Sequence, residues 1–238
     1  MFIFTKLDLM KNSDIKILCV DDEPDILEIL KYNLTNEGYD ISIASDGLAA
    51  IKKANEIIPN LIIMDVMMPN IDGIQACENL RSDEKFNETI IMFLTARGEE
   101  YSHLAAYEAG ADDYVTKPVK PKLLISKVKG LLRRFKKDKD NGINIIEHDD
   151  FKIDKEKYKV YISGNTLNLP RKEFELLYLL ASKPDKVFPR DKIMNKVWGG
   201  EVVVGDRTID VHIRKLREKI GDKYIKTIKG VGYKFIAD

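Results

Sequence analysis

Acidic residues follow two apolar runs in the first half of the sequence, where carboxylate chemistry would be possible. "ILCVDDEP" places Asp21, Asp22 and Glu23 after one run, and "LIIMD" ends another at Asp65. A short apolar run bounded by turn residues is typical of a buried strand in a parallel sheet. In such sheets, ligands bind beyond the carboxyl ends of the strands. If these two strands are neighbours, at least three carboxylates meet at one edge.

Carboxylates that are packed closely resist ionisation unless a cation joins them. A hard divalent ion with oxygen ligands, Mg²⁺ in the first place, would relieve the repulsion. Two further groups end later apolar runs, Thr95 in "IIMFLT" and Lys117 in "YVTKP". The alternative interpretation is a set of ordinary solvated acids at strand ends. The convergence of acids, a hydroxyl and a lysine at one end of one sheet favours a functional site.

Strand and helix patterns alternate through the first 135 residues. Strands are predicted over 15–20, 41–44, 61–64, 90–94 and 114–116. Helices are predicted over 24–37, 47–57, 73–81, 101–109 and 121–135, the first of which begins at a proline and stops before Gly38. Five βα units in about 120 residues imply an α/β doubly wound fold, a five-stranded parallel sheet with helices on both faces.

The charge of the chain is divided unequally between its halves. The 238 residues hold 39 basic and 39 acidic side chains, but residues 1–135 carry 16 Lys/Arg against 22 Asp/Glu, and residues 136–238 carry 23 against 17. This length suits two domains of ordinary size. An acidic half joined to a basic half indicates two domains, the second with a polyanionic partner.

The sequence carries only weak signals for disulfide bonds, zinc sites and membrane-spanning segments. Cys19 and Cys77 lie in apolar surroundings typical of small core residues, and the three histidines and two cysteines match no zinc spacing. No stretch approaches the roughly 20 apolar residues that span a membrane, and no cleavage site follows the opening segment. We expect a cytoplasmic protein with no membrane partner, in which residues 1–13 form an N-terminal extension.

Four segments of the first half carry a specific resemblance. "CVDDEP", "IIMDVMMPNIDG", "FLTARGEE" and "GADDYVTKP" resemble the receiver domain of two-component response regulators, over residues 14–135. The resemblance implies a flavodoxin-like receiver in which Asp65 takes a phosphoryl group from a sensor histidine kinase. It also implies that Asp22, Asp65 and the backbone carbonyl of Met67 ligate Mg²⁺ directly, and that Asp21 does so through water.

The same resemblance assigns the groups that surround the phosphate. Lys117 would pair with the acyl phosphate, and its peptide bond to Pro118 is expected to be cis. Thr95 would donate its hydroxyl to a phosphoryl oxygen, with Tyr114 turned inward behind it, so that these two residues form the switch. Catalysis by Asp65, Thr95 and Lys117 would then be positioning plus electrostatics. We expect no enzymatic activity beyond slow self-dephosphorylation.

The receivers that this sequence resembles usually pair through the fourth helix and fifth strand, so the resemblance implies a homodimer on phosphorylation. The acids and bases available for ion pairs across a two-fold axis are Glu108, Asp112, Asp113, Lys127, Lys129 and Arg134. On spacing alone, a solvated charged face is an equal alternative. The sequence departs from the family at His103 and Leu123, where a basic residue and a glutamate are common, so that ion pair is absent.

The second half begins after a charged linker at 136–143, and residues 144–238 form the second domain. Short strands surround a Ser-Gly-Asn turn before 169, and helices are predicted over 171–182, 190–198 and 207–220. "YIKTIKGVGYKFI" then indicates a hairpin. Residues 207–234 hold nine basic and three acidic side chains. This concentration fits a helix in the DNA major groove with a flanking hairpin, although a solvated basic surface is the alternative.

The third of these helices has two faces. Its predicted buried stripe consists of Ile209, Ile213, Leu216 and Ile220. The residues predicted on the opposite side are Thr208, Val211, His212, Lys215 and Lys219. The second set is the one that a groove-reading helix would present to DNA.

Four segments of the second half carry their own resemblance. "LPRKEFELLYLLA", "RDKIMNKVWG", "GDRTIDVHIRKLREKI" and "IKTIKGVGYKF" resemble the winged helix-turn-helix α+β effector domain of the OmpR/PhoB subfamily of response regulators. The resemblance implies binding to double-stranded promoter DNA. The implied contacts are Arg207, Thr208, His212, Arg214 and Arg217 at phosphates or groove edges, Val211 and Lys215 at base edges, Thr227 at the backbone, Lys229 in the minor groove, and Tyr233.

Two features of this domain leave alternatives open. Lys215 and Lys229 stand where many members carry arginine, and because lysine cannot make the planar two-pronged contact, the base preference there is open. The loop "GGEVVVGD" occupies the place where relatives touch RNA polymerase. Its run of three valines is consistent with that protein contact or with internal packing.

Three functions follow from these patterns. The leading hypothesis is a phosphorylation-switched transcriptional regulator that binds DNA. The second is a phosphate-independent dimerisation module, against which the complete set of Asp21, Asp22, Asp65, Thr95 and Lys117 argues. The third is a metal-dependent phosphohydrolase, against which the basic second domain and the lack of an additional general acid beside Asp65 argue.

Overall fold

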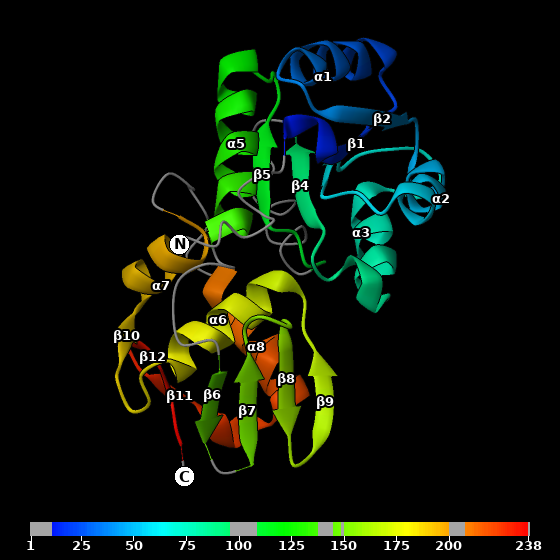
Figure 1. Cartoon of the computed structure of the whole chain (residues 1–238). Coiled ribbons are helices and arrows are strands. Elements are labelled where there is room, and N and C mark those ends of the chain that lie inside the picture. Colours follow the sequence, from blue (N-terminus) through cyan, green and yellow to red (C-terminus); the bar gives the residue numbers. More distant parts are fainter. Residues whose placement is uncertain (1–10, 96–108, 138–144, 149, 200–207, 238) are drawn as a thin grey trace, which may run out of the picture. The chain divides into compact units, whose positions relative to one another are not determined.

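In a computed structural model, the chain divides into two compact units, Met1–Asp140 and Asn141–Asp238. Figure 1 shows the elements of each unit. The structure describes residues 11–95, 109–137, 145–148, 150–199 and 208–237, and of 133–137 only the backbone. None of the helices in this part of the chain is both long and apolar enough to cross a lipid bilayer.

The first unit is built around one parallel sheet. Its strands are β1 (Lys16–Val20), β2 (Asp40–Ala44), β3 (Leu61–Asp65), β4 (Ile90–Thr95) and β5 (Asp113–Thr116). They lie in the order β2-β1-β3-β4-β5, and every neighbouring pair is parallel. The predicted five-stranded doubly wound sheet is confirmed.

Helices cover both faces of this sheet (Figure 1). They are α1 (Pro24–Asn36), α2 (Gly47–Ile57), α3 (Gly73–Arg81) and α5 (Pro121–Lys137), with short 3-10 turns at Asn12–Asp14 and Glu84–Phe86. α1 and α5 pack on one face through Leu30 and Val128, and α2 and α3 pack on the other through Ala54 and Cys77. Cys19 and Cys77 are both buried, as predicted for core residues. The helix expected over 101–109 lies outside the described residues except at its last position.

The second unit combines two antiparallel sheets with three helices. One sheet contains β6 (Ile145–His148), β7 (Phe151–Asp154), β8 (Lys159–Ile162) and β9 (Asn165–Asn168). The other has the order β10-β12-β11, formed by Phe188–Pro189, Gly232–Phe235 and Ile225–Ile228. The helices are α6 (Arg171–Ala181), α7 (Arg190–Val197) and α8 (Thr208–Ile220), and a 3-10 turn covers Asp222–Tyr224. The predicted α+β class and hairpin are confirmed.

The two-residue strand β10 was not predicted, because it is too short to show a periodic pattern. It pairs with β12, where Phe188 lies beside Tyr233 and Pro189 beside Gly232. A Cβ at Gly232 would lie 2.0 Å from the Phe188 carbonyl oxygen. The absence of a side chain at Gly232 therefore permits this strand to approach the hairpin.

Candidate functional site

Three carboxylates meet where β1 and β3 end. These strands are hydrogen-bonded neighbours, with Val20 beside Met64. Asp21 follows β1 and is fully buried, whereas Asp65 closes β3 and is 6% exposed. One oxygen each of Asp21, Asp22 and Asp65 lies within 4.8 Å of the others. Hard oxygen donors gathered at one point fit a Mg²⁺ ion.

A lysine from another strand end points into this cluster. Lys117 Nζ lies 2.9 Å from Asp21 Oδ2, 3.3 Å from Asp65 Oδ1 and 3.2 Å from Glu23 Oε1. The backbone N–H of Lys117 donates to the Thr95 carbonyl at 2.7 Å. The Lys117–Pro118 peptide bond is cis, which confirms the prediction. The described structure thus contains both the acids and the counter-charge of the predicted site.

The environment shifts the pKa values of these groups. Burial raises the pKa of Asp65 to about 6, and the charge of Asp21 adds to this effect, while Lys117 acts in the opposite direction. Burial lowers the pKa of Lys117, but the hydrogen bond to Asp21 and the charge of Asp65 outweigh it, so the net shift is upward. At neutral pH Asp65 is therefore mostly ionised and Lys117 is charged.

The loop after β3 is held tightly against Asp65. A Cβ at Gly73 would lie 2.0 Å from the Asp65 carbonyl oxygen and 3.1 Å from Phe93 Cε1. The Gly73 N–H donates to the Val66 carbonyl at 3.0 Å. Met67, whose carbonyl was expected to face the metal, lies within this loop, and its side chain is 64% exposed. The start of α3 thus fixes the backbone of the acidic residue.

The two expected switch residues lie on adjacent strands. Thr95 closes β4, is buried, and lies beside Thr116 of β5. Tyr114 is partly buried and packs against the core on the α2 and α3 face. Lys127 Nζ lies 5.7 Å from the centre of the Tyr114 ring. Residues 96–108, which would lie between these two strands in sequence, are outside the described part.

Asp112 does not lie on an open face, so its predicted role in an ion pair between protomers is wrong. It is 2% exposed, and its Oδ2 accepts from Arg81 Nη2 and from the Ile91 N–H, both at 2.8 Å. Arg81 also donates to the carbonyls of Gly110, Phe86 and Thr89. Arg81, on the last turn of α3, therefore draws Asp112 inward and fixes the turn before β5.

The other residues of the predicted dimer face have partners within the chain where the structure describes them. Lys127 Nζ lies 3.0 Å from Asp113 Oδ1 and 2.7 Å from the Tyr114 carbonyl. Lys129 Nζ lies 2.5 Å from Glu37 Oε2. Leu123 is 49% exposed. His103, Glu108 and the side chain of Arg134 lie outside the described residues.

The open side of α8 is narrower than its periodicity predicted. The stripe of Ile209, Ile213, Leu216 and Ile220 is buried, as predicted. Thr208, Val211 and His212 are buried as well, so their expected position on the open side is wrong. Arg214, Glu218 and Lys219 are exposed, and Lys215 and Arg217 are partly exposed. Arg207 lies outside the described residues.

His212 is a neutral core residue in this structure. Its ring centre lies 5.1 Å from that of Trp198, which ends α7. Burial lowers the pKa of His212 to about 3, and the charges of Lys215, Lys172 and Lys219 act in the same direction. The imidazole therefore carries no charge at neutral pH, and the expected phosphate contact loses its electrostatic basis.

Arginine side chains connect α8 to the hairpin β11–β12. Arg217 Nη2 donates to the Ile225 carbonyl and to Thr227 Oγ1, each at 2.8 Å. Asp210 accepts short hydrogen bonds from Arg190 and from the Tyr233 hydroxyl. Burial raises the pKa of Tyr233 to about 12, with Asp210 contributing. Thr227 and Lys229 remain exposed on the hairpin.

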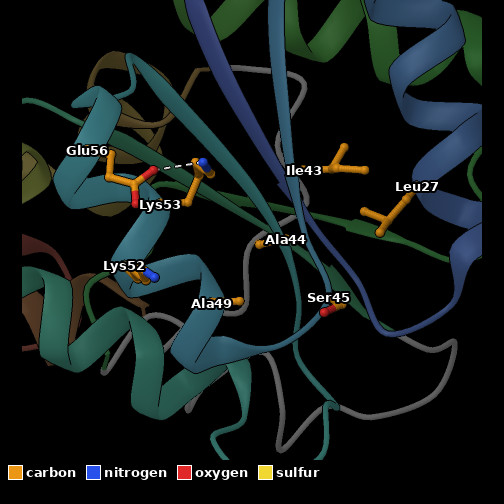
Figure 2. A pocket seen from close by; sticks show the side chains of 8 residues that line it. All are labelled: Leu27, Ile43, Ala44, Ser45, Ala49, Lys52, Lys53 and Glu56. Atoms are coloured by element: carbon orange, nitrogen blue, oxygen red, sulfur yellow. Dashed lines mark hydrogen bonds and ion pairs between the residues drawn. The ribbon is translucent and has the colours of Figure 1, made fainter.

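A cavity of about 360 Å³ lies beside the edge strand β2. Figure 2 shows its lining, Leu27, Ile43, Ala44, Ser45, Ala49, Lys52, Lys53 and Glu56, and the bond between Lys53 and Glu56. Glu56 is the only acid of this lining, and none of Asp21, Asp22 and Asp65 contributes to it. The cavity is therefore separate in composition from the carboxylate cluster.

Comparison with known proteins agrees with this geometry. Residues 17–129 match the response regulator receiver domain, and residues 164–235 match the C-terminal domain of transcriptional regulatory proteins. The chain is 43% identical over 233 residues to the alkaline phosphatase synthesis transcriptional regulatory protein PhoP of Bacillus subtilis, covering 92% of this chain and 95% of that protein. It is 39% identical to the transcriptional regulatory protein ResD of the same organism, covering 94% and 97%.

A solved structure of a RitR mutant gives the same fold at a TM-score of 0.77 and 26% identity, covering 94% of this chain and all of that one. The fold and the carboxylate site define a two-component response regulator that regulates transcription through a DNA-binding domain. Within this class, the chain belongs to the OmpR/PhoB family.

Sequence reasoning missed three residues that shape the site. Glu23 was counted among the strand-end acids but not as a partner of Lys117. Arg81 gave no signal because its partners are mostly carbonyls of distant residues. Gly73 was predicted only as the first residue of the helix over 73–81, whereas its close approach to Asp65 makes it part of the site. A glycine at the first position of the helix that follows a strand-end acid is the signal that could have indicated Gly73.

Proposed function

We propose that Asp65 accepts a phosphoryl group from a phosphohistidine of a sensor histidine kinase. The observation that supports this most is the convergence of three carboxylates and Lys117 at one end of the sheet. A carboxylate oxygen of Asp65 forms the bond to phosphorus while the phosphorus–nitrogen bond of the donor breaks, and its electron pair returns to the imidazole. The product is an acyl phosphate that hydrolyses slowly, and we propose no other enzymatic activity.

Asp21, Asp22, Asp65 and the Met67 carbonyl are proposed to hold Mg²⁺, which would neutralise charge on the transferring oxygens. Lys117 is already placed against Asp65 and can transfer one donor to a phosphoryl oxygen. Buried Thr95 closes the neighbouring strand and is proposed to offer its hydroxyl there. Lys117 and Thr95 are thus placed at the site before phosphate arrives, which favours electrostatic stabilisation of the transferring group.

We propose that Thr95 and Tyr114 form the switch and that phosphorylation promotes a homodimer through the face predicted from the fourth helix, over 101–109, and β5, with basic residues of α5 as further contacts. Asp113, Lys127 and Lys129 already have partners within the chain, so a dimer contact must share or replace those bonds. Phosphorylation should shift the protein from monomer toward dimer at protein concentrations of tens of micromolar, where a dimer with a binding free energy of about −6 to −7 kcal/mol is populated. Sedimentation that shows monomers in both states would contradict it.

The second unit is proposed to read promoter DNA with α8 and the hairpin β11–β12. Arg214, Lys215, Arg217, Thr227 and Lys229 are the described candidates that remain at least partly exposed. Of these, Lys215 is proposed to reach a base edge and Lys229 the minor groove. Arg207 is also proposed to contact DNA, and the segment 199–206 is proposed to contact RNA polymerase; Arg207 and residues 200–206 lie outside the described part of the chain. Residues 136–143 are proposed as the linker, and the cytoplasm as the site of action.

Labelling with acetyl phosphate and Mg²⁺ tests the phosphoacceptor. One phosphoryl group per chain is expected, and Asp65→Asn should abolish the label, whereas Asp25→Asn on the exposed first turn of α1 should retain it. Full labelling of Asp65→Asn would place the nucleophile elsewhere. Absence of label from the unmodified chain would favour a phosphate-independent dimerisation module, and multiple turnover on a phosphate ester would favour a phosphohydrolase.

A further inference from the structure

The side chain of Glu23 is directed to Lys117 rather than to its own helix. Glu23 is the N-cap residue of α1, yet it makes no side-chain capping hydrogen bond. Its Oε1 lies 3.2 Å from Lys117 Nζ, although the side chain is 64% exposed. Capping the first turn would satisfy a backbone N–H. Glutamate is not among the residues that favour this capping position, so its side chain is available for the contact with the lysine.

Lys117 is shared among three carboxylates. Asp21 and Asp65 lie 2.9 Å and 3.3 Å from its Nζ, and Glu23 is the third partner. A lysine ammonium has three N–H donors and no acceptor. Each donor thus has a carboxylate within reach in the resting site. A phosphoryl oxygen that binds Lys117 must compete with one of these acids.

Glu23 differs from the other acids because it lies outside the cluster that can hold a metal ion. That cluster consists of Asp21, Asp22 and Asp65. Its three negative charges are balanced by Lys117 together with a divalent ion. Glu23 adds a fourth negative charge beside Lys117, at the place where an anionic phosphoryl group would arrive. It attracts the cation and repels the phosphate.

We propose that Glu23 is a positioning residue that restrains Lys117 and slows acceptance of the phosphoryl group while it strengthens Mg²⁺ binding. This inference rests on the proposed phosphoacceptor role of Asp65. Glu23 holds one donor of Lys117 until the phosphoryl group displaces it, and its charge opposes the approach of the donor anion. The phosphorylation rate of this protein is therefore set in part by a residue that touches neither the metal nor the phosphorus.

A charge series at position 23 tests the proposal in the full chain. Glu23→Gln keeps the shape and the acceptor oxygen but removes the charge, and Glu23→Lys reverses it. With acetyl phosphate at saturating Mg²⁺, the labelling rate of Glu23→Gln should rise about 3–10-fold, as expected for one charge near the reacting group in a partly solvated site. Mg²⁺ affinity, measured by calorimetric titration without phosphodonor, should weaken about 2–3-fold.

Three further results separate positioning from a general disturbance of the fold. Glu23→Lys should raise the labelling rate and weaken Mg²⁺ binding further than Glu23→Gln does. The gain in labelling rate of both variants should shrink as the salt concentration rises from 0.05 to 0.5 M, because salt screens the charge. Glu28→Gln, an equal charge change further along the exposed side of α1, should leave both quantities within about 1.5-fold of the unmodified chain. A structural defect would slow labelling instead of accelerating it.

The proposal is overturned if Glu23→Gln labels at the rate of the unmodified chain or more slowly, or if Glu28→Gln reproduces its effect. This failure is distinguishable from failure of the proposed function. If only the role of Glu23 is wrong, Asp65 of the unmodified chain still takes one phosphoryl group. If the phosphoacceptor role of Asp65 is wrong, no label appears at Asp65 in any variant.

Discussion

The two units of the chain use charged side chains in opposite ways. In the first unit, Asp21 and Asp65 are almost fully buried beside Asp22, and Lys117 is shared among several acids. In the second unit, basic side chains on or near α8 have their own partners: Arg190 pairs with Asp210, and Lys219 pairs with Glu173. The carboxylate cluster of the first unit therefore concentrates like charges, whereas the surroundings of α8 in the second unit carry balanced pairs.

The difference follows from what each unit must recognise. A cluster of carboxylates is unfavourable by itself and becomes favourable when a compact divalent cation binds to it, and that cation together with Lys117 can then offset the charge of an incoming phosphoryl group. A DNA surface meets an extended row of phosphates, for which the orientation of helix and hairpin matters more than one strong site. Arg217 connects α8 to Ile225 and Thr227 and so helps to fix that orientation. We therefore expect the first unit to change state when its ligands bind and the second unit to be preassembled for DNA.

The largest expected difference concerns two ion pairs, one from each unit. Arg81 and Asp112 are 6% and 2% exposed, whereas Arg190 and Asp210 are 39% and 44% exposed. Arg81→Met should lower the free energy of unfolding of the first unit by about 3–5 kcal/mol, because it leaves a buried carboxylate and several carbonyls unpaired. Arg190→Met should cost the second unit about 0–1 kcal/mol. Urea titration followed by NMR in each unit measures both, and equal costs would break the comparison.

Replacing one glycine in each unit by alanine should give the next largest effect on stability. Gly73→Ala should destabilise the first unit by about 1–3 kcal/mol, because its Cβ would overlap the Asp65 carbonyl oxygen. It should also slow labelling of Asp65 by tenfold or more, since small misplacements of a reacting group are costly. Gly164→Ala, in open space but at φ +82°, should cost about 1–2 kcal/mol from backbone strain alone. Labelling unaffected by Gly73→Ala would show that α3 does not position Asp65.

The pH dependence of stability sharpens the contrast between the units. The pKa of Asp65 is about 6 in the folded chain against an ordinary 3.8, so the folded state binds more protons between these values. Without Mg²⁺, the stability of the first unit should therefore fall as pH rises from about 4 to 6 and remain lower above that. Asp65→Asn should remove this loss and stabilise the unit by about 1–3 kcal/mol at pH 7.

Guanidinium denaturation at pH 4 and pH 7, with chelator present, measures this effect in the two proteins. Asp25→Asn on exposed α1 serves as the matched control. A variant that is no more stable than the unmodified chain at pH 7 would show that burial does not penalise the Asp65 carboxylate.

The smallest expected effects separate two residues of α8. Arg214 is 62% exposed, with Glu218 at 3.8 Å, and Arg214→Ala should weaken binding to all DNA sequences alike and flatten the salt slope by about one unit. Lys215→Ala should instead relax discrimination at one base pair by about 1–3 kcal/mol. Salt titrations and footprints on tandem half-sites about 10–11 base pairs apart measure both. If Lys215→Ala weakens specific and random DNA equally, Lys215 is a backbone contact.

Local patterns in the sequence determined most of the elements. The apolar runs before Asp21 and Asp65 defined buried strands, and α2 and α3 have the predicted bounds, Gly47–Ile57 and Gly73–Arg81. Side-chain caps explain the starts of these helices, because Asp46 accepts from the Ala49 N–H and Asp72 accepts from the Gln75 N–H. Such signals act over a few residues, so they can be seen without the fold.

The tertiary structure decided which polar groups are open and which are paired. Asp112 was expected on an interface, but Arg81 approaches it from a helix 31 residues earlier and buries it. His212 was expected on the open side of α8, but Trp198 packs against its ring. The contact of Glu23 with Lys117 spans 94 residues. The sequence alone determined where charges and apolar stripes lie along the chain; their partners and pKa values required the fold, because burial and charge–charge interactions depend on distances between segments remote in sequence.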